Sequence, residues 1–436
     1  MGVPPRGAEA PQEWSVAREM QHVTTVAGRT WPGVVAFVAF AAVFLLQEVY
    51  RTVLAVAAPS VAADTDLSAA DVGFVTSIYF LAFAAVQLPL GILLDRFGPR
   101  RVVAAFLLFG AGGAAVFAIS DGMTGLAAGR ALTGLGMSCC LMAAFKANTL
   151  WWPSGRLVLA NGGVLTIGSL GVLIAATPLE HLLAVVDWRV VFLGLGAVPL
   201  FAAGAVHSLV PEPPPPDQHA ERADWPRLWR ELAAVLRSAV FWRFAPVTML
   251  TQAMWIAYQG LWAAPWLETV ASLDRPDVIR HLVWLAVAIA VGFFFSSVVI
   301  DALRRRGWSP PTVIGIGMAL FLLVQLLLVL DLGGRFSLVV WVAFGLFGTV
   351  SVAFYAILSQ AFSGHLAGRV NTTLNLLVFV SAFLIQFGVG EVIELWPARP
   401  DGGHPAVAHR AAMGILLALQ ALAFLWFLRP VPGRQD

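Results

Sequence analysis

Long apolar stretches, separated by short polar turns, constrain this chain more than any other feature of its sequence. A helix that crosses the hydrocarbon core of a bilayer needs about 20 largely apolar residues. The chain is 59% hydrophobic and only 12% charged, whereas a soluble domain is about 25% charged. So much apolar surface needs lipid as its solvent, which excludes a cytosolic enzyme or a secreted domain. Twelve segments are long enough to span a membrane: 33–58, 71–94, 101–119, 123–150, 159–180, 188–210, 243–267, 281–301, 311–331, 336–362, 370–396 and 409–428.

The placement of the arginines predicts how these helices are oriented. With the N-terminus in the cytosol, most basic residues fall in cytosolic segments, among them Arg222, Arg227 and Arg304 to Arg306. Cytoplasmic loops of membrane proteins carry an excess of Lys and Arg. We therefore expect both termini to be cytosolic and the protein to lie in the cytoplasmic (inner) membrane. The net charge of +2 is too small to suggest a nucleic-acid partner.

A polar interval at 211–242 divides the spans into two groups of six. From Asp224 to Arg237 its apolar residues recur at helical spacing, with arginines between them. This pattern is typical of an amphipathic helix on the cytosolic membrane surface, and an ordinary soluble linker helix is the alternative. The expected organisation is a cytosolic N-terminal tail (1–30), an N-terminal six-helix bundle (31–210), a cytosolic linker with an amphipathic helix (211–242), a C-terminal six-helix bundle (243–429) and a cytosolic tail (430–436).

The two halves resemble each other where their second spans end. The sequence GILLDRFGPRR at 91–101 follows the second span, and Asp301, followed by Arg304 to Arg306, stands at the end of the eighth. Each half thus places an aspartate before an arginine cluster at the cytosolic end of a span. Such internal duplication is typical of secondary transporters.

The stretch at 91–101 closely resembles the signature loop of the major facilitator superfamily of secondary transporters, and Arg130 with Gly134 and Gly136 resembles its fourth-helix motif. The resemblance covers nearly the whole chain. It implies twelve transmembrane helices in two pseudo-symmetric six-helix bundles, around a central site lined mainly by helices 1, 4, 7 and 10. It also implies a cytosolic latch that stabilises the outward-open state, for which anchoring by positive charge is the alternative role. The expected gating residues are Gly91, Asp95, Arg96, Gly98, Arg100, Arg101, Arg130 and Asp301.

Span one has a narrower likeness. Tyr50 and Arg51, with Pro59 eight positions after Arg51, resemble the first helix of the organophosphate:phosphate antiporter group. The resemblance implies that this arginine contacts an anion. That group usually has a second arginine on helix seven, where this chain reads WIAYQG at 255–260. The difference argues against a doubly charged phosphate as the substrate.

Glu48 and Arg51 lie inside span one, where ionisable residues cost about 2.5–3.5 kcal/mol on insertion scales and are functional by default. Gln47, Glu48 and Arg51 share one helical face because they are three and four positions apart. We expect Arg51 to bind the anionic group of a substrate, Gln47 to line the same site and Glu48 to carry a proton. A buried pair that only aligns helices is the alternative.

Lys146 is the only lysine of the chain. A buried lysine can lose its charge, whereas arginine effectively cannot, and a place on helix four would put Lys146 near Arg51 in the family architecture. A side chain that snorkels to the cytosolic interface is the alternative. Arg130 would face about 160° away from Lys146 on an ideal helix, unless the span bends at Gly134 and Gly136. We therefore expect a conformational role for Arg130.

Polar and aromatic residues on three other spans complete the expected substrate site. On span seven they form a stripe opposite Arg51, with packing and an interfacial aromatic belt as the alternative. On spans ten and eleven the candidates are Tyr355 and Asn375, although hydrogen bonds between helices also explain such residues. The residues of the span-seven stripe are Trp255, Tyr258, Gln259 and Trp262.

These features together predict a monomeric secondary active transporter that moves a small polar, anionic organic solute by alternating access, with proton-coupled uptake. The expected partners are the substrate, a proton or another coupling ion, and membrane lipid. The sequence suggests no cofactor, no metal site and no enzymatic activity. Proton-coupled efflux of a drug or metabolite is one alternative. Another is a membrane sensor that keeps the transporter fold and signals through residues 211–242.

Overall fold

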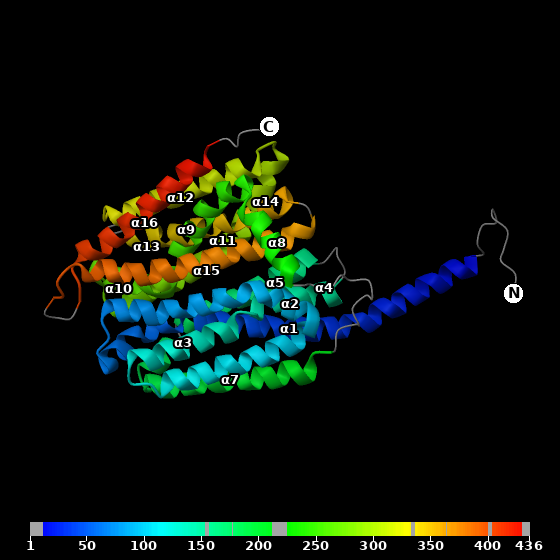
Figure 1. Cartoon of the computed structure of the whole chain (residues 1–436), viewed down its shortest axis with the longest axis horizontal. Coiled ribbons are helices and arrows are strands. Elements are labelled where there is room, and N and C mark those ends of the chain that lie inside the picture. The colour runs from blue at the N-terminus through cyan, green and yellow to red at the C-terminus, as the bar shows by residue number, and fades with distance from the viewer. Residues whose placement is uncertain are drawn as a thin grey trace.

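The computed structural model describes residues 12–152, 157–176, 178–211, 225–332, 336–362, 364–399 and 403–429. The regular structure in these ranges is entirely helical, without a strand. Figure 1 shows two bodies of packed helices side by side, one from the N-terminal half of the chain and one from the C-terminal half. This architecture confirms the predicted all-α membrane fold.

The helices follow one another with mostly short connections. The N-terminal half contains α1 (Gln12–Thr65), α2 (Ala69–Ala118), α3 (Met123–Met137), α4 (Cys140–Trp151), α5 (Leu157–Ala176), α6 (Pro178–Leu183) and α7 (Trp188–Leu209). The linker contains α8 (Trp225–Leu236), and the C-terminal half contains α9 (Ala239–Ala257), η2 (Tyr258–Trp262), α10 (Ala263–Thr269), α11 (Arg275–Arg305), α12 (Pro310–Val329), α13 (Ser337–Gly348), η4 (Thr349–Ala353), α14 (Phe354–Ala361), α15 (Gly364–Glu394) and α16 (Ala406–Phe427). Of the predicted tails and linker, residues 1–11, 212–224 and 430–436 lie outside the described residues.

The long apolar helices account for the predicted spans. Within the described ranges, nine helices are long and apolar enough to cross a membrane, and the bent pair Trp229–Leu236 and Ala239–Thr269 makes a tenth. One of the nine, α2, has 50 residues and is interrupted at Gly98, whose φ of 76° and ψ of 157° are not helical. Helix α2 therefore holds two predicted spans. Together with the shorter apolar helix Ala160–Ala175, these segments correspond to the twelve predicted.

Large apolar side chains remain exposed on the outside of both halves. Phe201 is 79% exposed, Phe294 is 75% exposed and Leu422 is 65% exposed. A protein surrounded by water rarely exposes large contiguous apolar patches, whereas lipid chains are a favourable environment for these side chains. The exposed apolar faces therefore agree with a protein that spans the membrane many times.

Helices α2 and α15 form the boundary between the two halves, where they pack along each other (Figure 1). Aromatic rings fill part of this interface, and the ring centroids of Phe83 and Phe379 are 4.2 Å apart. At the predicted outer end, the Ala70 N–H donates a hydrogen bond of 2.8 Å to the Glu394 carboxylate. The halves are thus in contact at their predicted outer ends.

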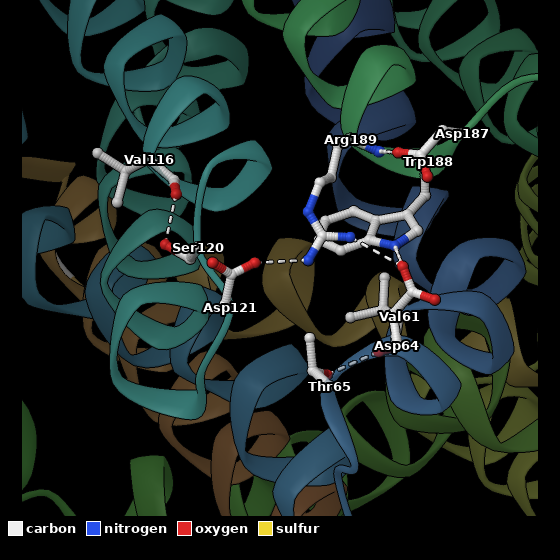
Figure 2. A network of polar contacts seen from close by, with 9 residues as sticks. All are labelled: Val61, Asp64, Thr65, Val116, Ser120, Asp121, Asp187, Trp188 and Arg189. Carbon is white, nitrogen blue, oxygen red and sulfur yellow. Dashed lines mark hydrogen bonds and ion pairs between the residues drawn. The ribbon is translucent and has the colours of Figure 1, made fainter.

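A polar brace joins three helix ends at the predicted outer end of the N-terminal half (Figure 2). Arg189, near the start of α7, contacts Asp64 near the end of α1 and Asp121 in the α2–α3 loop, each at 2.8 Å. Trp188 Nε1 donates to the same Asp64 carboxylate at 2.9 Å. The indole hydrogen bond and the Arg189 guanidinium lower the pKa of Asp64. These contacts therefore stabilise the ionised form of Asp64 and fix the ends of α1, α2 and α7 relative to one another.

The linker helix α8 packs against the C-terminal half. Val235 is buried in one apolar cluster with residues such as Phe241, whereas Trp229 is 58% exposed. Arg369 Nε of α15 donates to the Glu231 carboxylate at 2.8 Å. Helix α8 thus lies in the part of the linker where the sequence predicts an amphipathic helix, and its buried face contacts protein.

Candidate substrate site

Three neighbouring polar residues of α1 form a buried cluster on one helical face. Gln47 is 4% exposed and Glu48 is 7% exposed. The Glu48 carboxylate accepts hydrogen bonds from Arg51 Nη2 and from Gln47 Nε2. In the part of the chain that the structure describes, Gln47 Oε1 and Arg51 Nε have no hydrogen-bond partner. Buried polar atoms normally have one, so these two atoms are candidates for binding a ligand.

The seventh predicted span changes its winding where the polar-aromatic stripe lies. Helix α9 continues into the π-helical turn η2 (Tyr258–Trp262) before α10 begins. Such turns are rare and occur frequently at functional sites. All five residues of η2 are buried, and α1 of the other half packs against it. The structure thus brings two walls of the predicted site together.

The residues of the stripe differ in what their polar atoms contact. Gln259 is 8% exposed, yet both polar atoms of its side chain, like Trp255 Nε1, lack a hydrogen-bond partner among the described residues. In contrast, Trp262 Nε1 donates to the Gln386 carbonyl oxygen at 3.0 Å, within the same half. The Tyr258 ring packs among other aromatic rings of the C-terminal half. Gln259 and Trp255 therefore have buried hydrogen-bonding atoms left for a ligand.

Tyr355 and Asn375, predicted on separate spans, contact each other. The Tyr355 hydroxyl donates to Asn375 Oδ1 at 3.1 Å. Asn375 Nδ2 in turn donates at 3.3 Å to Oε1 of Gln87, on α2 of the N-terminal half. Sequence reasoning missed Gln87, for which the available signal was a single glutamine in an apolar span.

Lys146 lies at the signature stretch. Its Nζ atom contacts Asp95 Oδ1 at 2.7 Å, and the two side chains are 37% and 48% exposed. Helix α4, which carries Lys146, is separated from α3 by a break at Ser138 and Cys139, close to the position where a bend was considered. The geometry therefore joins Lys146 to the predicted gating residues through an ion pair that sequence reasoning did not propose.

Arg130 is a fully buried cation of α3, only 1% exposed. Its Nη1 atom donates to the Tyr50 carbonyl oxygen at 3.0 Å, and its guanidinium lies 4.7 Å from the centre of the Tyr79 ring. The Tyr50 hydroxyl donates to the Leu195 carbonyl oxygen at 2.6 Å. Arg130 thus connects α3 to α1 and α2, while its Nε and Nη2 atoms have no partner in the described part of the chain.

The two aspartates of the repeated motif make different contacts. Asp95 binds the lysine of another helix, whereas Asp301 binds Arg304 and Arg305 of its own helix at 2.8 and 2.7 Å. Gly98 has a φ of 76°, a region that favours glycine because other residues are strained there. The remaining predicted gating residues lie on the same helix α2: Gly91, Arg96, Arg100 and Arg101.

A model of the Major Facilitator Superfamily matches residues 33–385. That range begins at the first span and ends within α15, so it includes most of both halves. The chain belongs to the Major Facilitator Superfamily. It is therefore a multi-pass membrane protein of a family of transporters.

Individual relatives match shorter segments. The uncharacterized transporter YybO of Bacillus subtilis (strain 168) is 33% identical over 156 residues, which are 36% of this chain and 36% of that protein. The probable sulfoacetate transporter SauU of Cupriavidus necator is 27% identical over 164 residues, again 36% of each. The chain thus spans about a third of the length of these curated relatives. The crystal structure of a D-xylose-proton symporter has a TM-score of 0.72 and 13% identity, over 92% of this chain and 98% of that one, which shows a shared fold.

Proposed function

We propose that this transporter carries a small organic anion between its two halves, with the anionic group bound at Arg51. The observation that carries the proposal is the charge balance of one buried cluster. Arg51 pairs with Glu48 on α1. The Arg130 guanidinium donates to the carbonyl oxygen of Tyr50, the residue before Arg51, and lies 4.7 Å from the centre of the Tyr79 ring. Buried charges are costly unless they are paired. With two cations and one anion, this cluster has an excess positive charge that a substrate anion would neutralise.

Hydrogen-bonding atoms are available for such an anion. Within the described residues, Arg51 Nε, the Tyr79 hydroxyl and two nitrogens of Arg130 are buried without a partner. Hydrogen bonds from arginine to an ionised oxygen are about twice as strong as those between neutral groups. While Glu48 is ionised, one negative charge from a carboxylate or sulfonate balances the cluster, and protonation of Glu48 leaves a further positive charge that strengthens the binding of an anion. On the facing wall, Gln259 and Trp255 offer neutral hydrogen-bonding atoms for the rest of the substrate.

The contact between Glu48 and Arg51 supports proton-coupled uptake. Ionised Glu48 forms an ion pair with the Arg51 guanidinium, so its carboxylate competes with a substrate anion for the same hydrogen-bond donor. Protonation of Glu48 removes its charge and leaves Arg51 available for the substrate. Proton and anion therefore favour each other's binding, and this coupling is reciprocal by thermodynamic necessity. Such positive coupling is what a symporter needs.

One relative agrees with this substrate class. SauU is named a probable sulfoacetate transporter, and sulfoacetate is a small organic anion that carries a sulfonate and a carboxylate. Since the similarity covers only 36% of each chain, it supports an anionic substrate without identifying it. The buried charge cluster remains the main argument.

A ligand screen with variants of the full-length protein tests the proposal. A ligand that binds the folded state raises stability by RT ln(1 + [L]/Kd), about 2.7 kcal/mol at a concentration of 100 Kd. The probes are 2-hydroxyethanesulfonate, ethanesulfonate, acetate, xylose and the cation tetraphenylphosphonium. We expect at least one anion to raise the unfolding temperature of the wild type but not that of Arg51→Ala. A variant that keeps the positive charge, Arg51→Lys, should retain part of the effect.

The matched control is Arg280→Ala, because Arg280 has a side chain that is 56% exposed. This control should respond to the anion as the wild type does. If only tetraphenylphosphonium stabilises the wild type, the anion proposal is wrong and efflux of cations becomes the better account. Stabilisation of Arg51→Ala equal to that of the wild type would remove Arg51 from the site.

We also propose that the protein works as a monomer in the inner membrane with both termini in the cytosol. The arginine distribution supports this orientation. In intact cells, a membrane-impermeant thiol reagent should label Gly122→Cys, whose loop lies at the predicted outer end, and not Arg306→Cys. The reverse pattern would invert the topology, and with it the assignment of the gate.

A further inference from the structure

A chain of hydrogen bonds runs from the backbone of the N-terminal half to Tyr355 in the C-terminal half. Gln87 Nε2 donates to the Ser138 carbonyl oxygen at 3.2 Å. Asn375 Nδ2 donates to Gln87 Oε1 at 3.3 Å, and the Tyr355 hydroxyl donates to Asn375 Oδ1 at 3.1 Å. Gln87 is only 1% exposed, so bulk water does not compete for its amide group.

The Ser138 carbonyl sets the direction of every bond in this chain. A carbonyl oxygen only accepts, so Gln87 must turn its NH2 group toward Ser138 and its oxygen toward Asn375. Asn375 must then donate to Gln87 with its NH2 group and accept from Tyr355 with its oxygen. The single hydroxyl proton of Tyr355 is thereby used. Toward any further group, including the neighbouring Gln252 amide and a substrate, the Tyr355 oxygen acts as a hydrogen-bond acceptor.

We infer that Gln87 is a positioning residue of the substrate site, which acts through Asn375 and Tyr355. It fixes the Tyr355 oxygen as an acceptor and leaves the second N–H of Asn375 as a donor. A substrate hydroxyl satisfies both, since it donates to Tyr355 and accepts from Asn375. The inference rests on the proposed function, and it takes Tyr355 and Asn375, which are predicted from the sequence to line the substrate site, as residues that contact the substrate. It adds that the preferred organic anion carries a hydroxyl group.

The chain also ties this recognition to one state of the transporter. Gln87 lies on α2 and Asn375 on α15, the helices that meet at the boundary between the halves. When the halves separate at this level, Asn375 loses the partner that fixes its orientation. The hydroxyl group is therefore recognised best while α2 and α15 are in contact.

Two substitutions of Gln87 test the chain without any ligand. A protonated glutamic acid keeps one donor and one acceptor, as glutamine does, whereas ionised glutamate keeps only acceptors. Methionine has a similar size and offers no donor. Relative to the wild type, we expect Gln87→Glu to unfold at the same temperature at about pH 4, where a glutamate of the unfolded chain is also largely protonated, and at a lower temperature at about pH 8. The unfolding temperature of Gln87→Met should be below that of the wild type by the same amount at both pH values. If Gln87→Glu follows the wild type at both, the chain does not form and the inference falls.

A matched pair of anions tests the recognition of the hydroxyl group. 2-Hydroxyethanesulfonate and ethanesulfonate differ only in that group. The wild type should bind the hydroxylated anion about two- to tenfold more tightly, the range for one net hydrogen bond. Gln87→Met should bind both about equally, and Gln87→Glu should recover the preference at low pH. If Gln87→Met prefers the hydroxylated anion as strongly as the wild type does, the inference is wrong.

The control for this experiment is a buried glutamine pair of the C-terminal half. Gln325 and Gln420 exchange hydrogen bonds of 3.1 and 2.8 Å. Gln325→Met removes a buried amide as Gln87→Met does, and it should keep the wild-type preference between the two anions. If the wild type binds neither anion while Gln87→Glu shows the expected dependence on pH, the result counts against the proposed substrate class and supports the chain.

Discussion

The close packing of α3 against α2 allows a quantitative prediction. Gly129 has no side chain, and a Cβ atom built there would lie 2.6 Å from the Phe117 nitrogen and 2.8 Å from the Gly113 carbonyl oxygen. Ordinary contacts of a Cβ atom start at 3.4 Å. Both neighbours are backbone atoms, so in Gly129→Ala the two helices must move apart by about 0.6–0.8 Å, because no side chain can rotate away.

The expected cost follows from two opposing effects. Overpacking of this kind costs about 1–3 kcal/mol, whereas alanine is a better helix former than glycine by about 1 kcal/mol. We expect Gly129→Ala to lower the free energy of unfolding by up to about 2 kcal/mol. The lower stability should appear as a lower unfolding temperature in one detergent at one heating rate. This design avoids comparing values obtained under different conditions.

Gly194→Ala is the control, because a Cβ atom at Gly194 of α7 would have no heavy atom of the described residues within 4 Å, apart from its chain neighbours and the backbone of its own helix. The same chemical change should leave stability unchanged or raise it slightly. Equal unfolding temperatures of Gly129→Ala and Gly194→Ala would refute the reasoning, since helix propensity alone would then explain both variants.

Two further predictions concern charged groups at the helix ends. Lys146→Met should lower the free energy of unfolding by less than about 1 kcal/mol, because the ion pair between Lys146 and Asp95 is partly exposed. As the salt concentration rises, the difference in stability between this variant and the wild type should become smaller. A difference that becomes larger would contradict this prediction. Because contacts with Trp188 and Arg189 lower the pKa of Asp64, they stabilise the folded protein at neutral pH, and this contribution is lost only as the pH falls below about 4. Asp64→Asn should therefore be less stable than wild type at neutral pH and approach it in acid, and a constant difference in unfolding temperature across that range would exclude the effect.

Much of the fold could be predicted from the sequence because membrane spans have a simple physical requirement. A segment without enough apolar residues cannot replace water with lipid, so the spans are visible in composition alone. The breaks and changes of winding inside the spans could not be predicted in the same way. The break between α3 and α4 falls at Ser138 and Cys139, whereas sequence reasoning looked to glycines slightly earlier in the chain. The π-helical turn at Tyr258–Trp262 has no signature in a pattern that assumes a constant helical period.

The candidate site shows the same division. The grouping of Glu48 with Arg51 was predictable because both lie on one helix at a spacing of three residues. The partner of Lys146 was not, since Asp95 lies 51 positions away and reaches it only through the packing of α2 and α4. Gln87 was missed for a similar reason, because its partner Asn375 belongs to the other half. Contacts within one helix can be read from spacing, whereas contacts between helices depend on how the bundles meet.

Uptake into liposomes that contain the purified protein tests the central claim most directly. The probe is the organic anion that stabilises the protein best in the ligand screen. With the outside more acidic than the inside, the wild type should accumulate this anion against its concentration gradient. Glu48→Gln, which mimics the protonated carboxyl, should still exchange the anion across the membrane but should not accumulate it. Accumulation that does not depend on the pH gradient, or that is also seen with Glu48→Gln, would contradict proton coupling through the buried Glu48–Arg51 pair.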